Sequence, residues 1–270
     1  MSSEKQIEFT KENIDTYLKE VAKEYRKQIG KNMPAEIILI GGASVLVNYG
    51  FRDMTTDIDA VIQAASVMKD VISRVGDRYE LPAGWLNQNF IQTDSYSPKL
   101  SQFSEYYRTY SNVLTIRTIA AEYLIAMKLR SGRQYKSDLS DVLGILAEHE
   151  KNGKTITMER IQKAVSDLYG EWAALPEASR SFISNVMQDG RFSELYAETV
   201  VGEKETKELL IGFEAAYPGV TKEGNVNEIA ENLQRKTDRA SVLAQLRGIK
   251  TAAEQQQTSK KPKKKDDLER

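Results

Sequence analysis

Residues 39–62, LIGGASVLVNYGFRDMTTDIDAVI, decide the fold, because they place two aspartates in a predicted strand shortly after a glycine pair. Asp57 and Asp59 are i and i+2 in an apolar run, so in a strand they share one face, roughly 7 Å apart. Two such carboxylates repel each other and lose hydration unless something neutralises them. A divalent cation does this, so the pattern predicts a Mg²⁺ (or Mn²⁺) site at these two aspartates. The alternative is a strand end at which one aspartate caps a turn and the other faces water.

The glycine pair follows the apolar run 36–40 and precedes a short predicted helix. Gly41 and Gly42 let the backbone approach a ligand closely, and the N–H groups at the start of the helix suit phosphate oxygens. Ser44 adds a hydroxyl, and Arg52 adds a charge that can neutralise phosphate. These four residues are the predicted nucleotide-binding set. The alternative is a tight strand-to-helix turn with Arg52 as a solvated loop charge.

Composition excludes several kinds of site. The 270 residues contain no cysteine and one histidine, and the formal net charge is −1. Disulfides, thiolate metal sites and multi-histidine metal sites are therefore excluded, which leaves a hard cation held by carboxylates. Overall charge gives no sign of a nucleic-acid-binding surface. No apolar run is as long as a membrane span, and the N-terminus lacks a signal-peptide core, so we expect a cytoplasmic protein with no membrane partner.

The periodicity of apolar residues predicts an α+β chain. Helices are expected at 9–29, 43–50, 65–75 and 82–91, and strands at 36–40, 57–63, 104–110 and 113–119. This order implies a mixed sheet flanked by helices, with residues 1–119 as an α/β core that includes the N-terminal helix. Residues 120–250 are predicted to be an α-helical region. Residues 251–270 form a polar, Lys-rich stretch that is expected to be disordered.

A second group of charged residues lies in 123–146, YLIAMKLRSGRQYKSDLSDVLGIL. Lys128 falls in a helix too apolar to be a free surface, so its amine should meet a carboxylate or a nucleotide phosphate. Asp138 and Asp141 are i and i+3, on one side of the next helix. Two interpretations stay open. Lys128 and Asp138 either join a nucleotide site or form a structural ion pair between two helices.

The segments ILIGGASVL (38–46) and RDMTTDIDAVI (52–62) together resemble the nucleotidyltransferase superfamily of the DNA polymerase β type. The later segment is similar to one in small bacterial nucleotidyltransferase-like proteins, which include the AbiEii-like toxins of abortive-infection (type IV toxin–antitoxin) systems. The resemblance covers about residues 35–147. It implies the nucleotidyltransferase fold, metal binding by Asp57 and Asp59, and active-site roles for Lys128 and Asp138.

The resemblance also implies an activity, the transfer of NMP from NTP to an acceptor hydroxyl such as that of tRNA or another RNA. A toxin or phage-defence role with a cognate antitoxin protein would follow. The sequence departs from the three-carboxylate pattern, since 113–119 has Arg117 and no acid, and Glu105 and Glu122 are the nearest candidates. Two alternatives remain: a non-catalytic module that binds a nucleotide or a protein, and a small-molecule adenylyltransferase.

Overall fold

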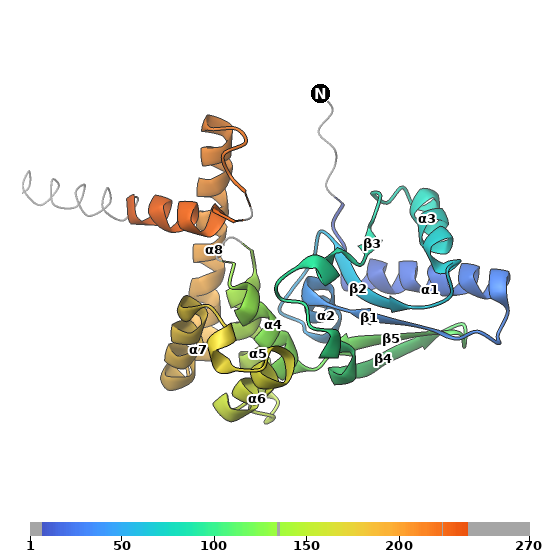
Figure 1. Ribbon diagram of the computed structural model, residues 1–270, viewed down its shortest axis with the longest axis horizontal. Coiled ribbons are helices and arrows are strands. Elements are labelled where there is room, and N and C mark those ends of the chain that lie inside the picture. Colours follow the sequence, from blue (N-terminus) through green and yellow to red (C-terminus); the bar gives the residue numbers. More distant parts are fainter. Residues whose placement is uncertain (1–6, 134–135, 223, 237–270) are drawn as a thin grey trace, which may run out of the picture. The chain divides into compact units, whose positions relative to one another are not determined.

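The computed structural model describes residues 7–133, 136–222 and 224–236 (Figure 1). The chain separates into two compact units, Met1–Gly202 and Glu203–Arg270. The predicted boundary between residues 119 and 120 lies inside the first unit. The predicted Lys-rich tail at 251–270 lies outside the described residues.

The first unit is built on a mixed sheet of five strands in the order β3-β2-β1-β5-β4. The strands are β1 (Ala35–Leu39), β2 (Ile58–Gln63), β3 (Leu86–Asn87), β4 (Ser104–Tyr110) and β5 (Leu114–Ile119). β1 runs antiparallel to β2 and parallel to β5, while β3 is parallel to β2 and β4 is antiparallel to β5. The predicted mixed sheet is therefore confirmed, and the last two strands lie within one residue of their predicted positions.

One face of the sheet is covered by α1 (Lys11–Ile29) and α3 (Met68–Arg78). The first turn of α1 is fixed by a capping box, in which Thr10 and Asn13 each accept from the other's backbone N–H. Alternate strand residues such as Ile37 and Leu39 point into this layer and are fully buried. The intervening strand residues therefore face the opposite layer.

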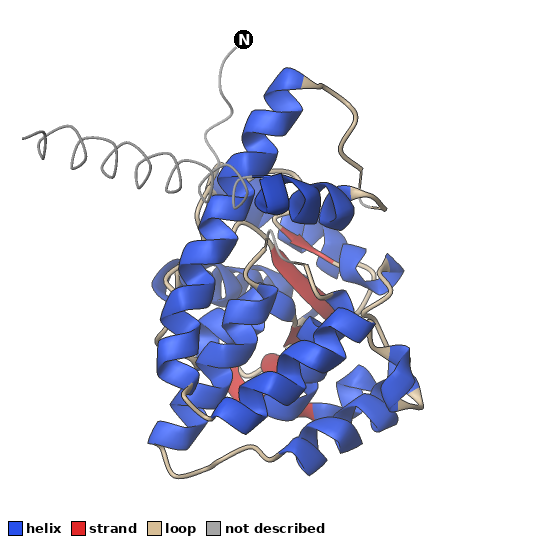
Figure 2. Cartoon of the chain, turned by 90° about the vertical axis from the view of Figure 1, so that its left-hand side faces the viewer, coloured by secondary structure: helices blue, strands red, loops and turns tan. Residues whose placement is uncertain are grey.

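The opposite face meets a layer of helices. It contains α4 (Ala121–Ser131), α5 (Asp138–Lys151), α6 (Met158–Tyr169) and α7 (Glu177–Asp189). Ile38, Ile40 and Ile119 of the sheet end share one buried cluster with these helices. In Figure 2 the strands, drawn in red, are seen behind helices drawn in blue. The sheet and the helices after it thus share a core, and the chain has the α+β architecture that its sequence predicts.

The predicted helix at 82–91 is wrong. Leu86 and Asn87 form β3 beside β2, and helical structure begins only with the 3₁₀ turn η1 (Asn89–Gln92). Gly84 has a φ of +74°, which turns the chain before the strand. The apolar residues of this segment imitate helical spacing, but the open edge of β2 decides its conformation. A second 3₁₀ turn, η2 (Pro98–Phe103), directly precedes β4.

The remaining structure is helical. The 3₁₀ turn η3 (Trp172–Ala174) precedes α7, and α8 (Phe192–Ala216) runs from the first unit into the second. Residues 226–236 are helical, within the predicted α-helical region at 120–250. In the second unit Leu210, Val226 and Ala230 are buried, and the Gln234 amide donates to the Thr206 hydroxyl. None of the described helices combines the length and the apolar character that crossing a membrane requires.

Candidate active site

The two aspartates lie at the start of β2, beside the turn that follows β1. Asp57 is exposed and immediately precedes the strand, and Asp59 is half-buried on it. The Ile40 N–H donates to the Asp59 carbonyl at 2.9 Å, which joins this point of β2 to the glycine turn. Ile58 and Ala60 point into the core under α1 and α3, so Asp59 points to the other face.

The surroundings of Asp59 disfavour its charged form. Burial and the charge of Asp57 raise the pKa of Asp59, although Lys136, Arg133 and a hydrogen bond from Asn87 act in the opposite direction. A half-buried carboxylate held beside a second one fits a divalent cation. Within residues 7–133, 136–222 and 224–236, no cluster of three or more His, Cys, Asp or Glu side chains has metal-binding geometry. The donor set that fits Mg²⁺ here is therefore these two aspartates, with further ligands left to substrate and water.

The glycine pair is required by local geometry. Gly41 has a φ of +55°, which side chains rarely allow, and begins α2 (Gly41–Asn48). A Cβ atom on Gly42 would lie 2.8 Å from Thr55 Oγ1 and 3.0 Å from Arg52 Nη2. The Thr55 hydroxyl in turn donates to the Asp57 carbonyl at 3.2 Å. The first turn of α2, the Arg52 guanidinium and the start of β2 are therefore in close contact.

Ser44 lies elsewhere. Its side chain is fully buried, and its hydroxyl oxygen accepts from the Ile119 N–H at 3.1 Å. It thus joins α2 to the end of β5, and it is not one of the groups that meet around Gly42. The first turn of α2 has no side-chain cap, since Ile40 stands at the N-cap position. The N–H groups of this first turn therefore have no side-chain partner at the N-cap, and N–H groups in this position commonly bind anions.

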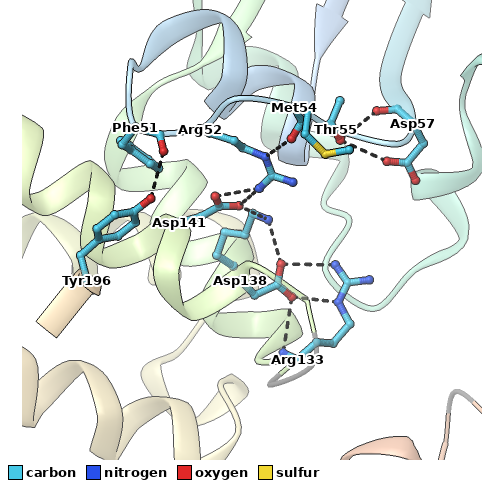
Figure 3. Close-up of polar contacts among 10 residues, drawn as sticks. Phe51, Arg52, Met54, Thr55, Asp57, Arg133, Asp138, Asp141 and Tyr196 are labelled. Atoms are coloured by element: carbon cyan, nitrogen blue, oxygen red, sulfur yellow. Dashed lines mark hydrogen bonds and ion pairs between the residues drawn. The ribbon is translucent and has the colours of Figure 1, made fainter. Parts of the chain in front are cut away.

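Lys128 and Asp138 lie together in a buried network of ion pairs, and Figure 3 shows Arg52, Arg133, Asp138 and Asp141 of this network. Lys128 Nζ is 2.8 Å from Asp138 Oδ1 and 2.7 Å from Asp141 Oδ2. Arg133 Nε donates to Asp138 Oδ2 at 2.8 Å. Arg52 Nη1 lies 2.7 Å and 2.5 Å from the two carboxylate oxygens of Asp141. Three cations thus surround two acids that are at most 2% exposed.

Charge pairing outweighs desolvation in this network. Burial alone would raise the pKa of Asp138, yet Lys128 and Arg133 hold that pKa well below its ordinary value. Burial would likewise lower the pKa of Lys128, but Asp138 and Asp141 raise it. Both directions favour the charged forms of Asp138 and Lys128. The geometry matches the interpretation of Lys128 and Asp138 as an ion pair between two helices.

Two arginines connect the aspartate pair and glycine turn with the buried ion-pair network. Arg52 reaches from the loop before β2 to Asp141 on α5, and its Nη2 atom faces Gly42. Arg133, which Asp138 holds, acts electrostatically on Asp59 together with Lys136. The sequence singled out Arg52, but it gave no signal that Asp141 is the partner of Arg52.

The run 113–119, where the sequence shows Arg117 in place of a third acid, forms β5, and neither nearby glutamate lies beside Asp59. β5 is separated from β2 by β1, and Arg117 on β5 donates to Ser104 on β4. Glu105 pairs with Thr118 across β4 and β5, and Glu122 forms an ion pair with Arg160. None of these acids belongs to the strands that flank Asp59.

On the side away from β1, β2 pairs with β3, which presents Asn87 directly opposite Asp59. The Asn87 side-chain oxygen accepts from the Asn89 N–H at 2.8 Å, and its amide hydrogen-bonds to Asp59. Sequence reasoning missed this residue because 82–91 was assigned to a helix. The signal that could have found it is the Pro-Ala-Gly turn before Trp85, followed by an apolar pair and a polar residue.

A mixed sheet with a glycine turn after one strand and two aspartates at the start of the next agrees with the nucleotidyltransferase fold. The chain belongs to a family described as "Nucleotidyltransferase of unknown function (DUF6036)", whose model matches residues 16–168. The matched range runs from α1 to the end of α6, so it includes both the aspartate pair and the buried network. Neither the search of curated proteins nor the search of solved structures gives a significant match.

Proposed function

We propose that this protein is a metal-dependent nucleotidyltransferase that transfers NMP from NTP to an acceptor hydroxyl. The observation that carries the proposal is the place of Asp57 and Asp59, two carboxylates next to an uncapped helix N-terminus with an arginine beside it. An anion site adjoining a divalent-cation site is what a nucleoside triphosphate requires.

Each group has a part in this proposal. The N–H groups of α2 and the Nη2 atom of Arg52 bind phosphate oxygens, while Gly41 and Gly42 admit the phosphate close to the backbone. Asp57 and Asp59 would hold Mg²⁺, which supplies charge neutralisation for the phosphates when bound. Arg133 and Lys136 add positive charge on the Asp59 side. Positioning and charge stabilisation of this kind are the main requirements of phosphoryl-type transfer.

The transfer itself is balanced without a further reactant. The acceptor oxygen forms a bond to the α-phosphorus, the bond from that phosphorus to the β-phosphate bridging oxygen breaks, and pyrophosphate leaves. The hydroxyl proton is released to solvent. The acceptor that we propose is tRNA or another RNA, with a toxin or phage-defence role, a cognate antitoxin and a cytoplasmic location. The support for this finer assignment is the sequence likeness to the AbiEii-like group.

A second candidate function is a nucleotide-binding module without turnover. The observation that favours it is Asn87, an amide at the strand position next to Asp59 where a third carboxylate would complete a metal site. A carboxamide there adds no negative charge, so a second metal ion would be held less tightly.

Labelling distinguishes the two candidates. Purified protein is incubated with Mg²⁺, each α-³²P-labelled NTP, and tRNA, total RNA or a panel of small hydroxyl compounds. Asp57→Asn and Asp59→Asn are tested beside Asp53→Asn, an exposed aspartate of the same loop. We expect RNA labelling that both site variants abolish and the Asp53 variant retains.

Other outcomes decide against parts of the proposal. Labelling of a small acceptor but not of RNA would make the protein a small-molecule nucleotidyltransferase. Metal-dependent nucleotide binding with no labelled acceptor supports the binding module. If Asp57→Asn and Asp59→Asn label RNA as wild type does, the aspartate pair is not the active site.

A further inference from the structure

We propose that Asp141 is a positioning residue that holds the Arg52 guanidinium at the start of α2, ready for a nucleotide phosphate. This inference rests on the proposed function and deepens it, because it assigns a part to the helical segment after the sheet. Asp141 lies on α5, 89 residues from Arg52 in the chain. Asp141 is not in the predicted nucleotide-binding set. We infer that it affects nucleotide binding by fixing the position of the Arg52 guanidinium.

The hydrogen bonds of Arg52 leave one side of its guanidinium for a ligand. Nε donates to the Met54 carbonyl at 3.0 Å, and Nη1 donates to both oxygens of Asp141. Nη2 lies on the side of Gly42, 3.0 Å from where a Cβ atom of that residue would be. The planar guanidinium is thereby fixed in orientation from two directions, with its remaining nitrogen at the phosphate-binding turn.

Lys128 is a second partner of the Asp141 carboxylate. Asp141 is 2% exposed, and burial of a carboxylate is costly unless cations pair with it. Lys128 Nζ, 2.7 Å away, is one such partner, and Arg52 is the other. Lys128 is therefore a buried counter-ion shared by Asp138 and Asp141.

Packing holds the loop that carries Arg52. A Cβ atom on Gly144 of α5 would lie 2.5 Å from the Phe51 ring, so this ring packs directly on the α5 backbone. The Phe51 carbonyl accepts from the Tyr196 hydroxyl at 2.9 Å (Figure 3). The residue before Arg52 is thus anchored to two helices, which limits how far the arginine can move when a ligand arrives.

A purely structural role for the Asp141–Arg52 pair makes a different prediction from a positioning role. In the structural case, loss of Asp141 lowers stability and leaves nucleotide affinity unchanged. In the positioning case, loss of Asp141 lowers affinity only while Arg52 is present. A double-mutant cycle on nucleotide affinity separates the two.

The experiment measures binding of a non-hydrolysable NTP analogue with Mg²⁺ by calorimetry, together with thermal unfolding. Variants are Asp141→Asn, Arg52→Met and their combination, with Asp15→Asn as control. Asp15 also pairs with an arginine, Arg108, but on the α1 side of the sheet. We expect Arg52→Met and Asp141→Asn each to weaken affinity about tenfold, which is the range for a charged hydrogen bond. We expect the double variant to be no weaker than Arg52→Met.

Arg52→Lys covers the case in which Asp141→Asn fails to fold. A lysine keeps the charge beside Asp141 at a position where the side chain is 19% exposed, but it lacks the nitrogen at Gly42. We expect reduced affinity with an unchanged unfolding temperature. Affinity equal to wild type in both Asp141→Asn and Arg52→Lys would overturn the inference, as would independent, multiplying effects in the double variant. If the wild-type protein binds no nucleotide, both the proposed function and this inference are wrong. If binding is lost in Asp57→Asn but unchanged in Asp141→Asn, only this inference is wrong.

Discussion

Asn87 stands directly opposite Asp59 across the parallel pair of β3 and β2, and its amide hydrogen-bonds to the Asp59 carboxylate. A neutral donor at this point stabilises the charged form of Asp59, where a carboxylate would repel it. The pair therefore sets how many negative charges the site offers to a metal ion.

Asn87→Asp tests this relationship. The added carboxylate should tighten Mn²⁺ binding about tenfold, as measured by calorimetry, because ligand charge raises the affinity of hard cations. Without metal it should lower the free energy of unfolding by about 1–3 kcal/mol, through repulsion and the loss of the hydrogen bond. Asn89→Asp, which adds the same charge two residues away, is the control. Equal effects of the two substitutions would show that Asn87 has no special place in the site.

Gly42→Ala tests the close contact at the glycine turn. The new methyl group would meet Thr55 Oγ1 at 2.8 Å and Arg52 Nη2 at 3.0 Å, so the arginine or the loop must shift. We expect a loss of about 1–3 kcal/mol in unfolding free energy, typical of overpacking, and weaker nucleotide binding. Gly50→Ala is the matched control, since a Cβ atom there has nothing within 4 Å. Wild-type affinity in Gly42→Ala would contradict a phosphate site at this turn.

Lys128→Met tests the buried counter-ion. Removal of the amine leaves Asp138 and Asp141 with one arginine each, and breaking a buried ion pair in this way costs about 3–5 kcal/mol. Chemical denaturation measures the difference. Lys163→Met, which removes an exposed partner of Asp167, should change stability by less than about 1 kcal/mol. A similar, small effect of both variants would mean that the network does not stabilise the helical layer.

Asp59→Asn tests the electrostatic strain at the metal-free site. The folded-state pKa of Asp59 is raised, so ionisation of this group disfavours folding above that pKa, and wild type gains stability as pH falls through it. We therefore expect the variant to be more stable than wild type near pH 7 without metal, and the difference to shrink as pH falls below the ordinary range for Asp. Thermal unfolding across pH 3–8, roughly the range where carboxylates and histidine titrate, measures this. A variant less stable than wild type at pH 7 would contradict the interpretation.

Local pattern was enough for much of the fold. Alternating apolar residues are a property of a few consecutive positions, so strands at 104–110 and 113–119 could be predicted to within a residue of β4 and β5. The same holds for the glycine turn before α2, whereas of the two aspartates predicted on one strand face only Asp59 lies within β2 and Asp57 directly precedes it. Prediction from local pattern fails at β3, because a strand of two residues is too short for its apolar pattern to be distinguished from that of a helix.

The sequence by itself was enough to predict that Asp57 and Asp59 lie close together after a glycine turn. It also predicted that Lys128 lies on one helix, and that Asp138 and Asp141 lie on the next. Only the tertiary structure showed which side chains these residues contact. Asn87 meets Asp59 because β3 pairs with the open edge of β2, and Arg52 meets Asp141 because α5 packs against the loop before β2. Such partners are chosen by packing between segments far apart in the chain, where charge balance in a buried layer depends on every neighbour at once.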